Sequence, residues 1–77
     1  MPNGVFNWTF DDVVKILKEN GFHLNHIRGS HFYYVGFHSK KMWQVCVPKH
    51  GTGALKPRTF KGIMEQSGLS KKVWMGN

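Results

Sequence analysis

Two strands and the turn between them can be read in residues 31–47, HFYYVGFHSKKMWQVCV. Residues 31–37 are rich in Phe, Tyr and Val, which favour extended backbone, and residues 42–47 form a second apolar run of the same kind. The polar residues 38–41 between these runs predict a tight turn. Pro48 cannot donate a hydrogen bond to a strand ladder, so we expect the second run to end there. The stretch therefore predicts an antiparallel hairpin.

The residues before the hairpin predict a helix. In residues 10–17 apolar side chains recur at i, i+3, i+4 and i+7, which is the spacing of one helical face. Thr9, followed three residues later by Asp12, resembles a capping box, which satisfies backbone N–H groups at the start of a helix. Asn20 and Gly21 are typical of a helix end, because glycine readily adopts the left-handed conformation found there.

The remaining elements complete the expected fold. Residues 22–27 predict a first strand, and residues 49–57 form a loop after the hairpin. Thr59 is expected to cap a second helix that runs to about Ser67, and Ser70 to begin a short final turn. The order of helix, three strands and helix predicts an α+β fold of the αβββα type. Its three-stranded antiparallel sheet carries both helices on one face and leaves the other free for a ligand.

The length and composition indicate one small domain. The chain has 77 residues, of which we expect 1–8 to be an N-terminal leader and 9–77 a single domain. Its one cysteine, Cys46, excludes an internal disulfide, suits a reducing compartment and is expected to pack in the core. No apolar run reaches the roughly 20 residues of a membrane span, and no signal-peptide pattern occurs, so we expect a cytoplasmic location.

Acidic residues are absent from a long central window of this basic chain, whose net charge is +7. The four acids are Asp11, Asp12, Glu19 and Glu65. The window between them holds all five histidines and the cations Arg28, Lys40, Lys41, Lys49, Lys56, Arg58 and Lys61. An uninterrupted positive field attracts polyanions, which makes a nucleic acid or an acidic protein the expected partner.

Most catalytic chemistries lack their residues in this sequence. One cysteine and scattered histidines do not form a metal-ligand set, so neither a metal nor another cofactor is expected. The four acids do not supply a catalytic pair, and no phosphate-binding glycine loop or serine-nucleophile motif occurs. RNA, however, carries its own nucleophile, the 2′-hydroxyl. Histidine can move a proton near neutral pH, and Lys or Arg can stabilise the extra phosphate charge.

His31 is the candidate for that proton transfer. It follows a glycine and a serine at the start of the strongest predicted strand. Glycine lets a ligand approach the backbone, and a serine hydroxyl can hydrogen-bond a phosphate or orient the imidazole. The candidate RNA-binding residues around it are Arg28, Gly29, Ser30, Lys49 and His50. Which aromatic residues of 32–37 face outward, where they can stack on bases, stays open because both alternating sets are apolar.

Several blocks occur in a characteristic order between residues 10 and 71. They are Ile16–Phe22, Arg28–His31, Val45–His50, Lys56–Ile63 and Ser67–Ser70. In order and spacing these blocks resemble the HicA (YcfA-like) toxin family. The resemblance implies a fold like the double-stranded-RNA-binding domain and a metal-independent endoribonuclease that cleaves mRNA and blocks translation. It also implies a HicB-type antitoxin that shields the site, with a homodimer or a heterotetramer containing the antitoxin as candidate assemblies.

The resemblance also assigns roles to single residues. The family's catalytic histidine falls on His31, and Gly29 and Ser30 match the residues before it. Family members often carry a further histidine or polar residue within this motif, whereas Phe32 comes next here. This departure motivates an alternative in which the same fold binds RNA without cutting it. A third hypothesis is an interaction protein whose basic surface serves an acidic partner.

Overall fold

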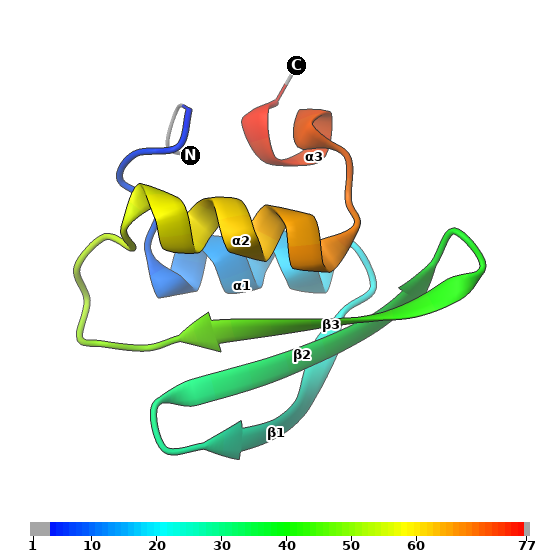
Figure 1. Cartoon of the computed structure of the whole chain (residues 1–77), viewed down its shortest axis with the longest axis horizontal. Coiled ribbons are helices and arrows are strands. Elements are labelled where there is room, and N and C mark those ends of the chain that lie inside the picture. Colours follow the sequence, from blue (N-terminus) through cyan, green and yellow to red (C-terminus); the bar gives the residue numbers. More distant parts are fainter. Residues whose placement is uncertain (1–3, 77) are drawn as a thin grey trace.

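The computed structural model describes residues 4–76, so residues 1–3 of the predicted leader lie outside it. The elements are α1 (Phe10–Glu19), β1 (His23–Arg28), β2 (His31–His38), β3 (Lys41–Pro48), α2 (Pro57–Ser67) and α3 (Lys71–Met75). The strands form one antiparallel sheet in the order β1-β2-β3 (Figure 1). The helices lie toward the β3 end of this sheet, and β1 is the strand farthest from them (Figure 1). The predicted αβββα order is confirmed, and the final turn after Ser70 is α3.

The start of α1 is held by the predicted capping box. The Asp12 backbone N–H donates to Thr9 Oγ1 at 3.2 Å, and the Thr9 backbone N–H donates to Asp12 Oδ2 at 3.0 Å. The helix ends at Asn20, and Gly21 follows with a φ of 86°. These reciprocal bonds satisfy two backbone donors that the helix itself leaves unpaired.

Removing the cap hydroxyl should weaken the fold by a small, measurable amount. We expect Thr9→Ala to cost about 1 kcal/mol of unfolding free energy. This corresponds to a fall of about 4–8 °C in the midpoint of thermal unfolding for a domain of this size. Circular dichroism measures that midpoint, and Thr9→Ser is the matched control because it keeps the hydroxyl. Equal midpoints for the alanine and serine variants would contradict the role of the cap.

The two turns of the sheet set its register. Gly29 has a φ of 61° and is the first central residue of the turn that pairs Arg28 with His31. A left-handed first residue is the mark of a type II′ turn, in which glycine is favoured. Ser39 and Lys40 both have positive φ, of 50° and 66°, as a type I′ turn requires. Both turn types match the twist of the strands, so the register continues without a break through each hairpin end.

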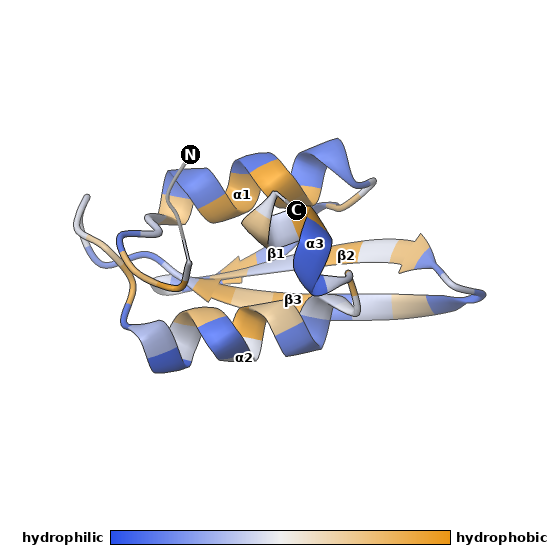
Figure 2. Ribbon diagram, turned by 90° about the horizontal axis from the view of Figure 1, so that it is seen from above, coloured by the Kyte–Doolittle hydropathy of each residue, from blue (hydrophilic) through white to orange (hydrophobic). Residues whose placement is uncertain are grey.

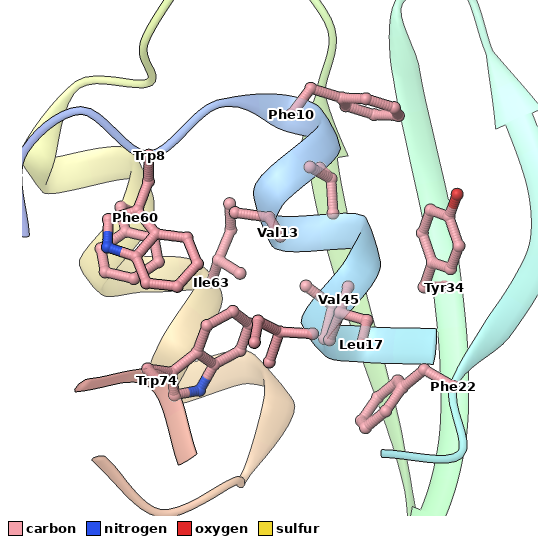
Figure 3. Close-up of a cluster of buried hydrophobic side chains, with 12 residues drawn as sticks. Trp8, Phe10, Val13, Leu17, Phe22, Tyr34, Val45, Phe60, Ile63 and Trp74 are labelled. Atoms are coloured by element: carbon pink, nitrogen blue, oxygen red, sulfur yellow. The ribbon is translucent and has the colours of Figure 1, made fainter. Parts of the chain in front are cut away.

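The core lies between the helices and one face of the sheet. Tyr34, Val45 and Val47 are the buried hydrophobic side chains of the strands, and directly paired or alternate positions place all three on the same face. Figure 3 shows Tyr34 and Val45 with side chains of α1 and α2 in one cluster. In the view from above, the strands appear between α1 and α2, with β3 next to α2 (Figure 2). Side chains of both helices join the core cluster on the face that carries Tyr34, Val45 and Val47, and the predicted α+β fold of the αβββα type is confirmed.

The core extends beyond the predicted start of the domain. Trp8, the last residue of the predicted leader, is 0% exposed. Its ring stacks on Phe60 of α2 with centroids 4.6 Å apart and meets Trp74 of α3 edge-on at 5.7 Å (Figure 3). The Leu55 backbone N–H donates to the Trp8 carbonyl at 2.6 Å. The boundary between leader and domain at residue 8 remains a prediction, but Trp8 itself packs with the domain.

Two local predictions were wrong. Thr59 does not cap α2, because the helix begins at Pro57 with Lys56 as its N-cap residue. Proline suits the first helical position, where its missing N–H costs nothing, so the helix starts three residues earlier than predicted. Cys46 is not in the core: it pairs with Tyr33 on the opposite sheet face and is only partly buried. Alternation along β3 turns the neighbouring valines inward and Cys46 outward.

Candidate functional site

The open face, as we call the side of the sheet turned away from the helices, carries most of the predicted site. The strand register places four imidazole or guanidinium side chains on it, all of them exposed: His23, His26, Arg28 and His31. Tyr33 lies among them on β2. No acidic residue occurs between positions 20 and 64, so these side chains face solvent in a field of one sign.

His31 is positioned by the turn that precedes it. As the first residue of β2 it pairs with Arg28 on one side and with Pro48 on the other. Side chains of directly paired residues project from the same face, so the guanidinium stem of Arg28 and the imidazole of His31 stand side by side. The sheet thus holds an imidazole and a permanent positive charge side by side at one exposed corner.

His50 joins His31 from the loop after β3. The two imidazole centroids are 6.4 Å apart, and their planes are nearly perpendicular at 89°. The loop is held in place by a hydrogen bond of 2.8 Å from the Lys49 backbone N–H to the Ser30 carbonyl. This bond joins the residue before His31 to the residue before His50. The structure therefore brings together Arg28, Ser30, His31 and His50 of the predicted set.

Gly29 leaves its side of the turn open. A Cβ atom built on Gly29 would meet no atom within 4 Å, and the residue's φ of 61° is one that other residues rarely adopt. The backbone at this corner is consequently accessible to a ligand, as the sequence predicted.

Lys49 does not direct its ammonium group toward His31. Its Nζ lies over the rings of Phe10, at 5.1 Å, and Phe32, at 5.8 Å, both of which pack on the helix side of the sheet. These cation–π contacts account for the orientation. The backbone of Lys49 contributes to the site through its bond to Ser30, whereas its charge lies at the rim of the opposite face.

A cavity of about 300 Å³ lies beside His50 where the loop meets α2. Its lining includes Phe10, Pro48, His50, Leu55, Lys56 and Thr59. The first turn of α2 contains no acidic residue, so its free N–H groups and Lys56 make this end of the helix positive. Sequence reasoning missed Lys56 and Thr59 as neighbours of His50. The sequence contains a signal for this: a proline at position 57 favours a helix start there, which puts the beginning of α2 directly after the loop.

The phenol of Tyr34 is not a candidate for proton transfer. Burial raises the pKa of the Tyr34 hydroxyl above its usual value, so this phenol stays protonated at neutral pH. Across residues 4–76, no group of three or more His, Cys, Asp or Glu side chains is arranged to hold a metal ion. Within the same residues, no helix has both the length and the apolar character needed to cross a bilayer.

Comparison with known families identifies the chain. A family model described as "HicA toxin of bacterial toxin-antitoxin" matches residues 10–69. The chain belongs to the HicA toxin family. It is thus the toxin of a toxin–antitoxin system, and such a system includes an antitoxin partner. Comparisons with curated proteins and with solved structures found no match.

The HicA match spans every residue of the predicted site, whereas Trp8 and Trp74 lie outside it. The structure also shows where this HicA chain departs from the expected motif. Phe32 packs edge-on against Phe10 at 4.9 Å and faces the helices, not the open face. The residue after His31 therefore belongs to the core side of the sheet, and its change to phenylalanine removes no group from the surface that His31 occupies.

Proposed function

We propose that this HicA toxin is an endoribonuclease that cleaves mRNA without a metal ion, with His31 as a general acid or base. The observation that carries this proposal is the exposed His31 imidazole, which stands beside Arg28 and 6.4 Å from the His50 ring on a face without acids. Histidine suits proton transfer near neutral pH, and a positive surface suits a polyanionic substrate.

The chemistry needs two proton transfers around one phosphodiester. The 2′-hydroxyl of a ribose loses its proton and attacks the adjacent phosphorus. A new bond forms to the 2′-oxygen, and the bond to the 5′-oxygen of the next nucleotide breaks as that oxygen gains a proton. One imidazole removes the first proton and another supplies the second. The spacing and perpendicular planes of His31 and His50 allow them to approach a phosphodiester from two sides.

The surrounding groups stabilise the charge that develops on phosphorus. Arg28 projects beside His31 and can donate two parallel hydrogen bonds to phosphate oxygens. Ser30 offers a hydroxyl next to His31, and the turn glycine before it leaves the backbone accessible. Lys49 reaches the phosphate only if its side chain leaves the two phenylalanine rings, so we assign it a weaker contact. Such donors stabilise the transition state most when they are positioned before the reaction begins.

Cleavage should continue when divalent metals are removed. We expect the purified full chain to cut a labelled mRNA at the same rate in EDTA as in magnesium. The reason is that His31 transfers the proton and Arg28 stabilises the phosphate charge, so no metal ion is needed. Denaturing gel electrophoresis measures the products. Loss of cleavage in EDTA with recovery on adding magnesium would contradict the metal-free mechanism. RNA that is shifted in a native gel but stays intact over hours would favour the non-catalytic RNA-binding module instead.

The partner that fits this proposal is a HicB-type antitoxin that covers His31 in the cytoplasm. A homodimer or a heterotetramer with the antitoxin remains the candidate assembly. An acidic partner surface would complement the open face, since residues 20–64 contain no acid.

A further inference from the structure

We infer that His26 and Tyr33 form a stacking platform for an unpaired RNA base next to His31. The inference rests on the proposed function for its ligand class, and it names two residues that the site described above does not include. It assigns single-stranded RNA as the form that the open face holds.

The platform is a pair of parallel rings on adjacent strands. The centroids of His26 and Tyr33 are 4.3 Å apart, and their planes differ by 8°. A β-bulge between Leu24 and His26 shifts the register so that His26 pairs directly with Tyr33. His26 Nδ1 lies 2.6 Å from Asn25 Oδ1, a distance at which the ring N–H donates and fixes the imidazole plane. The two rings are therefore already stacked in the absence of a ligand.

We place the base on the side of the Tyr33 ring that faces away from His26. Paired side chains on neighbouring strands have Cβ atoms about 5 Å apart, so parallel rings at 4.3 Å must face each other across the strands. The other side of Tyr33 is then turned toward β3, where its paired residue is Cys46. The thiol is small and only partly buried, so the proposed slot for the base lies above it. A nucleobase in this slot would continue the stack of His26 and Tyr33.

The slot lies one step along β2 from His31. Residues 31 and 33 point the same way, and two residues of a strand span about 7 Å. A base stacked on Tyr33 would therefore lie about 7 Å from the His31 corner, close enough for a phosphodiester of the same strand to reach His31. Bases in a duplex already stack on their neighbours, so only an unpaired base can enter. Stacking is tolerant of base identity, which suits a nuclease that acts on many messages.

The test measures binding separately from cleavage. In a His31→Ala background, fluorescence anisotropy gives the affinity for a labelled mixed-sequence single strand, alone and annealed to its complement. We expect Tyr33→Leu to weaken single-strand binding about tenfold, within the range for loss of one base stack. Tyr33→Phe keeps the ring and should bind like the parent. Duplex binding, which does not use the slot, should change little in either variant.

A second pair of variants tests the slot itself. Cys46→Phe fills the space above the thiol and should weaken single-strand binding as much as Tyr33→Leu, whereas Cys46→Ala leaves the space open and should not. Circular dichroism verifies that each variant is folded. Parental affinity of Tyr33→Leu and Cys46→Phe, or an equal loss for duplex and single strand, would overturn the platform.

The outcome is distinguishable from failure of the nuclease proposal. If the wild-type chain cuts no RNA but Tyr33→Leu loses single-strand affinity, the platform stands and the catalytic assignment fails. If the wild-type chain cuts RNA and Tyr33→Leu binds normally, the platform fails and the nuclease stands.

Discussion

Replacing His31 by alanine is expected to lower RNA cleavage by about 10²- to 10⁴-fold, the contribution typical of a positioned acid or base. The side chain is exposed on the open face, so its loss leaves no cavity in the core. The free energy of unfolding should therefore stay within about 0.5 kcal/mol of the wild-type value. Cleavage of a labelled mRNA gives the rate, and urea unfolding followed by circular dichroism gives the stability. In cells, the variant should no longer inhibit growth.

His23→Ala is the matched control for this experiment. His23 is another exposed imidazole on the open face, but it pairs with Val35 and lies at the opposite end of β1 from Arg28. His23→Ala removes an imidazole from the open face but not from the His31 corner, so this variant should keep its cleavage activity. Undiminished cleavage by a folded His31→Ala protein would refute the assignment of His31. Equal losses in both variants would indicate a role for the whole face instead of a single proton-transfer group.

The largest expected effect on stability belongs to Trp8. Removing a large aromatic side chain from a well-packed core costs about 3–5 kcal/mol. A domain of this length has a total unfolding free energy of about 4–12 kcal/mol, so the loss is a large share of the whole. Trp8 stacks on Phe60 and contacts Trp74, which joins the first residues of the chain to α2 and α3. We expect Trp8→Ala to lower the thermal midpoint by more than about 10 °C.

Phe6→Ala provides the comparison for Trp8→Ala. Phe6 lies in the same leader but is 63% exposed, so its loss should change the unfolding free energy by less than about 0.5 kcal/mol. Trp8→Phe keeps an aromatic ring against Phe60, so its unfolding free energy should lie between those of Trp8→Ala and Phe6→Ala. A Trp8→Ala protein with an unchanged midpoint would mean that the leader contributes nothing to the stability of the domain.

The elements of the fold could be predicted because local signals agreed. The capping box at Thr9, the apolar face of α1 and the polar turn after β2 each depend on a few neighbouring residues. The start of α2 was misplaced because Thr59 and Pro57 are both start signals, and the proline decided it. Trp8 was assigned to the leader because its partners are far away in the sequence, on α2 and α3.

The sequence nominates the residues of the candidate site, but it does not determine which sheet face each side chain points to. Arg28, His31 and His50, which the sequence nominates, lie close together in the structure. Phe32 and Tyr33 are adjacent and both aromatic, so composition alone cannot say which one faces the helices. The same limit applies to Cys46, which lies between two valines and was expected to share their burial. Only the pairing register, which depends on the bulge in β1 and on both turns, decides which side each residue faces.

The position of Cys46 has a practical consequence for handling this toxin. The chain's one sulfhydryl lies beside Tyr33 on the open face and is partly accessible. Two such groups, oxidised by dissolved oxygen, would join two molecules with their open faces turned toward each other. That covalent pair would hide the proposed site of both molecules without altering either fold. Preparations kept under air therefore need a thiol reductant, since a fully folded sample can otherwise be inert.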